Sequence, residues 1–155
     1  IEALLTAVKE AEGVPGEGTR ISAMGMQGHY GMTDPSFDRV ELAIKRYAAI
    51  VGSVQITEFD LKARDGYDGS DKAKQEEYEK QATRYQVLYN VMKNLNQKED
   101  IQITGITFWG TVDHYSWLQN RSNVGGGSSG NLPQCPLLFD DKYEPKPAFY
   151  VFAGE

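Results

Sequence analysis

Helical and strand-like patterns alternate along this chain of 155 residues. Apolar residues recur at helical spacing in four segments, at 1–12, 33–51, 70–95 and 146–155. Short apolar runs typical of strands lie between them, at 21–27, 54–59 and 103–109, with a fourth candidate strand at 137–139. Alternation of this kind predicts parallel strands covered by helices, which is an α/β fold.

Cap signals define where two of these helices begin. Thr33 or Asp34 is expected to cap the second helix, with Pro35 in its first turn. Ser70 or Asp71 is expected to cap the third. The segment 111–134 reads as a long surface loop, because it contains the Gly/Ser-rich stretch NVGGGSSGN.

Composition excludes several kinds of partner and cofactor. The net charge is −6 and no Lys/Arg cluster offsets it, which argues against nucleic acid and against anionic membranes. No apolar run approaches the roughly 20 residues that cross a bilayer. A single cysteine, Cys135, excludes an internal disulfide and a cysteine-based zinc site. The two histidines could at most belong to a mixed metal site.

Polar and aromatic residues follow each predicted strand. They are Gln27, His29 and Tyr30; Glu58 and Asp60; Trp109, Asp113, His114 and Trp117; Asp140 and Asp141. In parallel α/β folds the functional groups lie at the carboxyl ends of the strands. An amide, an imidazole, carboxylates and two indoles are therefore expected at one edge of the sheet.

The stretch VQITEFD ends a buried strand on two acids. Side chains of a strand alternate, so Glu58 and Asp60 are expected to point the same way. Two like charges on one side repel unless a neighbour holds them. We predict that His29 holds them and that the acids serve chemistry. The alternatives are that Glu58 is an acidic loop onset and that His29 is structural.

Other members of the set also have structural interpretations. Tyr78, Tyr85 and Tyr89 follow the helical period, which indicates packing. Asp113 and the pair at 140–141 are typical of caps and turns. Trp117 lies in a loop, and a binding role would explain an indole there.

Five motifs in order resemble the signatures of glycoside hydrolase family 10, the endo-β-1,4-xylanases. They are GMQGHY, TDPSFDRVELAIKRYA, VQITEFDL, GITFWGTVDHYSWL and PLLFDDKYEPKPAFYVF. Members of this family are (β/α)8 TIM barrels that cleave the xylan backbone with retention of anomeric configuration. The resemblance implies that residues 1–155 are a partial catalytic domain, the C-terminal half of the barrel with strands five to eight.

The resemblance also implies roles for individual residues. Glu58 matches the catalytic nucleophile, His29 the histidine that hydrogen-bonds it, and Asp60 the acid that orients this histidine. Substrate binding is expected from Gln27, Tyr30, Trp109 and Trp117, since flat indole faces suit pyranose rings. The chemistry needs no cofactor and no metal at the reacting centre.

One part of the family pattern is missing from the sequence. The general acid/base of the family is a glutamate that follows an asparagine, and no Asn-Glu pair occurs in these residues. We therefore expect the N-terminal half of the barrel as a partner, either as a separate chain or as more of the same polypeptide. The loop at 119–134 is also longer than the family pattern leads us to expect.

Three functions remain open at this point. The first is a retaining endo-1,4-β-xylanase that acts on xylan or xylo-oligosaccharides, secreted or held outside the cytoplasm. The second is a half-barrel that binds carbohydrate without catalysis. The third is a related β-glycanase that acts on another β-1,4-glycan.

Overall fold

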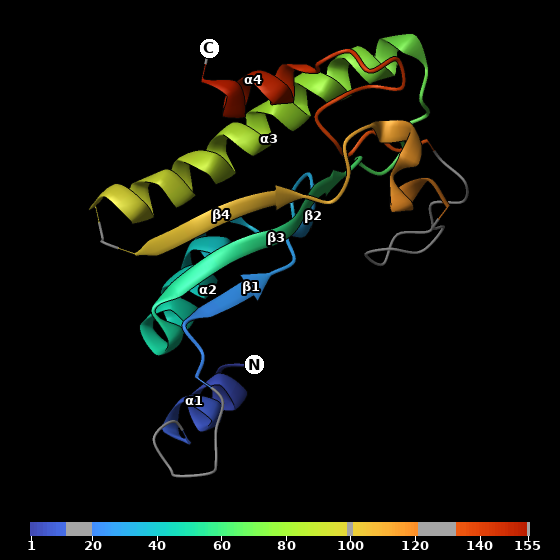
Figure 1. Ribbon diagram of the computed structural model, residues 1–155. Helices are drawn as coiled ribbons and strands as arrows, with labels where there is room; N and C mark the ends of the chain where they lie inside the picture. The colour runs from blue at the N-terminus through green and yellow to red at the C-terminus, as the bar shows by residue number, and fades with distance from the viewer. Residues whose placement is uncertain (12–19, 99–100, 121–132, 155) are drawn as a thin grey trace.

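The computed structural model describes residues 1–11, 20–98, 101–120 and 133–154. The helices in this part are α1 (Glu2–Glu10), α2 (Phe37–Val51), α3 (Asp71–Lys98) and α4 (Pro147–Ala153), with 3₁₀ helices η1 (Asp113–Tyr115) and η2 (Trp117–Asn120). The strands are β1 (Ala23–Met26), β2 (His29–Gly31), β3 (Ser53–Lys62) and β4 (Gln102–Phe108). The alternation predicted from sequence is confirmed (Figure 1).

All strand pairs in this sheet are parallel, and β3 lies at its centre. β1 pairs with the first part of β3 and β2 with its last part, while β4 pairs along the other edge. The core lies between this sheet and the helices α2, α3 and α4, and it contains Val54, Ile56 and Phe59 of β3. On the other side of β3, the exposed amide of Gln55 donates to Thr104 Oγ1 of β4 at 3.0 Å. Helices on one face only are the arrangement of a (β/α) barrel.

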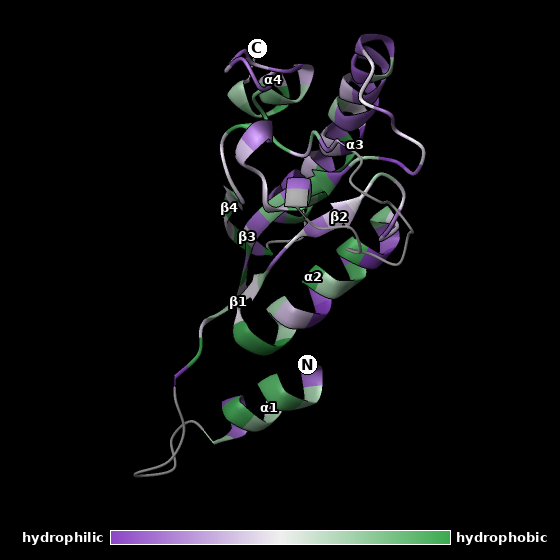
Figure 2. Ribbon diagram, turned by 90° about the vertical axis from the view of Figure 1, so that its right-hand side faces the viewer, coloured by the Kyte–Doolittle hydropathy of each residue, from purple (hydrophilic) through white to green (hydrophobic). Residues whose placement is uncertain are grey.

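The apolar residues of α1 are exposed or only partly buried in the described part of the chain. Much of the helix is green in Figure 2, yet none of its residues is buried and Leu4 is 67% exposed. The helix lies beside α2, to which Glu2 is paired through Arg46 (Oε1–Nη1 3.2 Å). No helix of the described ranges is long and apolar enough to span a bilayer.

The predicted bounds of two elements in the N-terminal part of the chain were wrong, namely those of the first strand and the start of α2. The segment 21–27 is a strand only over Ala23–Met26, and a second strand starts at His29. The N-cap of α2 is Ser36, so Asp34 and Thr33 do not cap it and Pro35 lies before the helix. At α3 the prediction is confirmed, since Ser70 Oγ accepts from the backbone N–H of Ala73 at 3.3 Å.

The predicted fourth strand at 137–139 is not a strand. Only Phe139 makes a parallel bridge, to Val112. The physical reason lies at Leu137, whose backbone N–H donates to the carboxylate of Asp113 at 2.8 Å instead of to a neighbouring strand. The Gly/Ser-rich stretch of the predicted loop lies outside the described residues.

The structural interpretations of three other residues are confirmed. Tyr85 is fully buried in the core, and Tyr89 packs against Phe152 with ring centroids 5.2 Å apart. Asp140 is a turn residue, because its carboxylate accepts from two backbone N–H groups two and four residues later.

Candidate active site

Between Ile56 and Phe59, the central strand β3 contains one residue more than the strand on either side of it. Met26 pairs with Ile56 and His29 with Asp60, so three steps along one edge match four steps of β3. Along the other edge, Ile106 pairs with Ile56 and Phe108 with Phe59, so two steps match three. The extra residue is a β-bulge at 57–58, a feature common next to active sites.

The bulge changes which side chains of β3 face the core. Val54 and Ile56 are buried before it, and Phe59 and Leu61 are buried after it. In an unbroken strand the even-numbered positions 54, 56, 58 and 60 would share one face. The bulge therefore turns Glu58 and Asp60 away from the helices, and apolar side chains take the core positions.

Gly28 lies opposite the bulge, in the short connection between β1 and β2. Gly28 has φ +87°, and a Cβ there would lie 2.7 Å from Ile56 Cγ2. The backbone on both sides stays paired, with Glu58 N donating to Gln27 O at 2.7 Å and Asp60 N to Gly28 O at 3.3 Å. Only glycine fits this conformation beside Ile56, so Gly28 lets the edge follow the bulge.

The imidazole of His29 lies between the two acids. Its Nε2 is 3.1 Å from Glu58 Oε2 and its Nδ1 is 3.0 Å from Asp60 Oδ1. Carboxylate oxygens only accept, so when both acids are ionised both contacts require the doubly protonated ring. The cation then lies between two anions, which removes the repulsion expected for paired acids.

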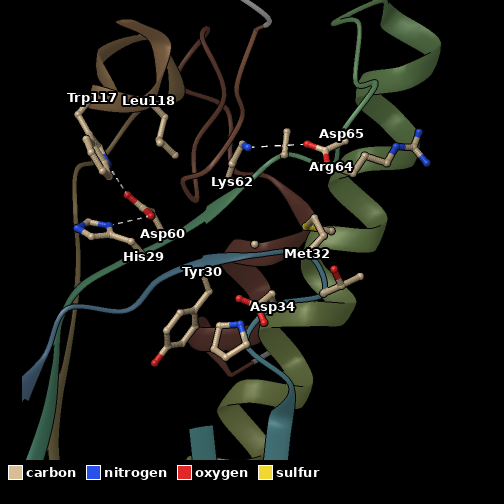
Figure 3. Close-up of a pocket in the computed structure, with 14 residues that line it drawn as sticks. His29, Tyr30, Met32, Asp34, Asp60, Lys62, Arg64, Asp65, Trp117 and Leu118 are labelled. Carbon is tan, nitrogen blue, oxygen red and sulfur yellow. Dashed lines mark hydrogen bonds and ion pairs between the residues drawn. The ribbon is translucent and has the colours of Figure 1, made fainter. Parts of the chain in front are cut away.

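Asp60 is the buried member of this group. Its side chain is 1% exposed, against 22% for Glu58. Burial raises the pKa of Asp60, while hydrogen bonds from Trp117 and His29 act in the opposite direction. Trp117 Nε1 donates to Asp60 Oδ2 at 2.7 Å, so the indole and the imidazole each occupy one oxygen (Figure 3).

Two indoles flank the imidazole. The ring centroid of Trp117 is 4.7 Å from that of His29, and the centroid of Trp109 is 6.2 Å away, edge-on. Trp109 is 47% exposed, which leaves much of its surface open to a ligand. The structure thus brings His29, Glu58, Asp60 and both tryptophans together.

Tyr30 and Gln27, the other two predicted binding residues, have surroundings that differ from those of His29. The ring of Tyr30 packs edge-on against Phe59 at 5.9 Å and points away from His29 in Figure 3. Burial raises the pKa of this tyrosine to about 12. Gln27 is exposed, and its backbone carbonyl meets Glu58. Tyr30 has a packing environment because His29 and Tyr30 are consecutive in β2 and face opposite sides.

A cavity of about 340 Å³ adjoins the group. Its lining includes His29, Tyr30, Asp60 and Trp117, together with Lys62 and Asp34 (Figure 3). Lys62 Nζ lies 3.8 Å from Asp65 Oδ1. Within the described ranges, no three His, Cys, Asp or Glu side chains gather as a metal site.

A buried ion pair lies next to the segment 109–119, which follows β4 and which we call the tryptophan loop. This ion pair was not predicted. Lys146 Nζ is 2.9 Å from Asp113 Oδ2, and both side chains are almost fully buried. The interpretation of Asp113 as a cap or turn residue missed this pairing. The two residues are 33 positions apart, so no local pattern signals the contact. His114, the next residue, is exposed and is not part of the site.

Comparison with known proteins identifies the family. The model of glycosyl hydrolase family 10 matches residues 2–154. The chain belongs to glycosyl hydrolase family 10. An endo-1,4-beta-xylanase of Geobacillus stearothermophilus is 32% identical over 157 aligned residues, covering 96% of this chain and 42% of the relative. The chain thus spans less than half the length of this curated family member.

Solved structures of the family confirm the expected fold. A thermostable xylanase mutant from Cellvibrio japonicus matches 98% of this chain and 44% of its own, with 28% identity and a TM-score of 0.71. A mutant of xylanase A from P fluorescens subsp. cellulosa, in complex with xylopentaose, also matches 98% of this chain and 44% of its own, with 26% identity and a TM-score of 0.73. The chain has the fold of part of a (β/α)8 barrel, as the resemblance implied.

Proposed function

We propose that this chain supplies the nucleophile side of a retaining endo-1,4-β-xylanase. The observation that carries the proposal is the imidazole of His29 between Glu58 and Asp60 at 3.1 and 3.0 Å. The family match and the relatives named as endo-1,4-beta-xylanases support it. A group that only binds sugar has little need for a histidine held between two carboxylates.

Glu58 is the nucleophile of the proposed reaction. Its carboxylate attacks the anomeric carbon as the glycosidic bond breaks, and the leaving oxygen takes a proton from an acid. Water then attacks the glycosyl-enzyme ester and gives that acid its proton back, so Glu58 is released unchanged. His29 contacts the attacking carboxylate and orients it, and Asp60 orients His29.

The acid in this scheme comes from outside the chain. Retaining enzymes place their two carboxyl groups about 5–5.5 Å apart. Asp60 lies near Glu58, but both of its oxygens are occupied and its side chain is 1% exposed. We therefore propose that the other half of the barrel, on this or another polypeptide, provides the acid/base glutamate.

The two tryptophans are proposed to hold the sugar next to the scissile bond. The Nε1 of Trp117 is already used by Asp60, so its ring face is what it offers to a pyranose. Trp109 offers an exposed face beside the same imidazole. Gln27, at the same strand end, is proposed to contribute a hydrogen bond.

The proposed substrate is xylan or its oligosaccharides, and the proposed site of action is outside the cytoplasm, where a polymer is accessible. A second β-1,4-glycan is a specific alternative. One relative, from Acetivibrio thermocellus, is named an exoglucanase and is 31% identical over 137 residues.

The proposal is tested with the complete polypeptide that carries this chain, as wild type and as Glu58→Gln. We expect the wild type to release reducing ends from xylan faster than from a soluble cellulose derivative, with the β-anomer as the first product by NMR. Glu58→Gln is expected to lose activity on the order of 10⁴-fold or more while it stays folded.

Other results would contradict parts of the proposal. An initial α-anomer excludes a retaining mechanism. Faster release from the cellulose derivative favours the glucan alternative. Xylan binding without turnover in the wild type favours the non-catalytic binder.

A further inference from the structure

The buried ion pair of Lys146 and Asp113 has no part in the proposed chemistry. The Lys146 side chain is 1% exposed, and its ammonium group donates to both oxygens of Asp113 (2.9 and 3.3 Å) and to Cys135 O (2.7 Å). The ring of Tyr78 lies 4.7 Å from Nζ. Burying an ammonium is costly unless such partners hold it, so the pair marks a place where the local geometry is tightly defined.

Asp113 connects this ion pair to the loop that follows β4. Its backbone N–H donates to Phe139 O at 3.1 Å, and its carboxylate accepts from Leu137 N at 2.8 Å. Its own carbonyl accepts from Ser116 N at 3.0 Å and from Gln119 Nε2 at 2.9 Å. Asp113 is therefore anchored to the 137–139 segment, and the two 3₁₀ helices η1 and η2 start from this anchor.

A second anchor lies just beyond Trp117. Gln119 exchanges two hydrogen bonds with the backbone of Gln134, at 2.7 and 3.1 Å. The side chain of Gln134 in turn accepts from Ala63 N, just after β3, at 2.9 Å. Trp117 is thus held between an anchor at 113 and an anchor at 119.

Trp117 transmits this placement to the acids. Its Nε1 donates to Asp60 at 2.7 Å, and its ring lies 4.7 Å from the imidazole of His29. A loop that moved by 1 Å would lengthen this hydrogen bond beyond the usual range. Asp60 would then lose one of its two donors, and the imidazole would lose part of its orientation.

We infer that Asp113 and Lys146 are positioning residues for the carboxylate of Glu58, and that they act through Trp117. The inference rests on the proposed function only for the role of the Glu58 carboxylate as a nucleophile. The physical core is a coupling between a buried ion pair and an imidazole, and it can be measured without turnover.

The test uses the complete polypeptide that carries this chain, labelled with ¹⁵N. The variants are Lys146→Met, which removes the cation at similar length, and Asp113→Asn, which keeps an acceptor for Leu137 N at the same size. Glu77→Gln is the matched control. Glu77 is also a buried acid, and it pairs with Arg64 (Nε–Oε2 3.0 Å) rather than with the tryptophan loop.

We expect both pair variants to shift the indole N–H resonance of Trp117 and to change the titration of the His29 ring nitrogens. If the protein turns over xylan, kcat is expected to fall about tenfold, since small misplacement of a reacting group is costly. Glu77→Gln is expected to lower Tm while both NMR signals stay at their wild-type values. Asp113→Asn decides alone if Lys146→Met does not fold.

A cycle with Trp117→Phe tests the route of the coupling. This variant lacks the indole N–H, so adding Asp113→Asn to it is expected to leave the His29 titration where Trp117→Phe alone has it. A full additional change would overturn action through Trp117. Pair variants that lower Tm and leave the Trp117 and His29 signals unchanged would overturn the inference itself. Shifted signals in a protein without xylanase activity would sustain it and contradict the proposed function.

Discussion

The two ends of β3 differ in what their side chains do, although both lie in one strand. Before the bulge, Val54 and Ile56 pack on the helices and Gln55 faces the other side. After it, Phe59 and Leu61 pack on the helices, and the acids at positions 58 and 60 face the imidazole of β2. One extra residue lets a buried strand end in a charged site without turning a carboxylate toward the helices.

The largest expected effect comes from the apolar residue that the bulge places in the core. Phe59 is fully buried against Tyr85 and Phe108. Phe59→Ala is expected to lower the free energy of unfolding by about 3–5 kcal/mol through lost contacts and a cavity. Gln55→Ala, at an exposed position before the bulge, is the control and should change it by about 0.5 kcal/mol or less. Urea denaturation measures both, and equal effects would contradict this comparison.

The next effect concerns the glycine that faces the bulge. Gly28→Ala places a Cβ 2.7 Å from Ile56 Cγ2 at φ +87°, and we expect a loss of about 2–4 kcal/mol from strain and overpacking. Gly66→Ala is the matched control. Gly66 has φ +82° with nothing within 4 Å of the built Cβ, so only the backbone term, about 1–2 kcal/mol, applies. Similar losses in the two variants would remove the close approach to β3 as an explanation.

The third prediction tests the charged end of β3, where His29 contacts Glu58 and Asp60. His29→Ala is expected to lower kcat roughly 100-fold, because Glu58 loses a donor and its orientation. The pH–rate profile should change as well, because the imidazole that contacts both carboxylates is lost. His114→Ala, at an exposed histidine, is expected to leave the profile unchanged. An unchanged profile in His29→Ala would make that histidine structural.

The last prediction is a pH dependence at the buried pair. Burial raises the pKa of Asp113 to about 6 in the folded protein, above its ordinary 3.8. The folded state therefore holds this proton more tightly than the unfolded state. The stabilisation is complete below pH 3.8 and is lost as the pH rises toward 6.

Asp113→Asn removes this dependence. The stability of the wild type relative to the variant should fall between about pH 4 and 6 and level off above that. Thermal unfolding of both proteins across this range measures the difference. A difference that is independent of pH would mean that Asp113 is ionised in the folded protein throughout.

The apolar part of β3 and its charged end could be predicted from the sequence, because the residues that define them are close together along the chain. The apolar run of β3 and the acids that end it are contiguous, and the matched motif order points to His29 as their neighbour. The bulge was not visible, because it is defined by pairing with β1, β2 and β4. The same holds for Lys146, whose partner lies 33 residues away.

One error had a physical cause that sequence patterns do not carry. The segment 137–139 has the composition of a strand, but the N–H of Leu137 is taken by the Asp113 side chain. The binding role of Tyr30 stays a prediction, since its ring packs edge-on against Phe59 while the residue also lines the cavity beside His29.

The most direct test of the account is to identify the residue that becomes covalently attached to sugar. The complete polypeptide would be incubated with a 2-deoxy-2-fluoro-β-xylobioside bearing a good leaving group, then digested and analysed by mass spectrometry. We expect one added fluoroxylobiosyl group on the peptide that contains Glu58, and none in Glu58→Gln. Attachment to Asp60 or to a peptide outside β3, with Glu58 unmodified, would contradict the central claim.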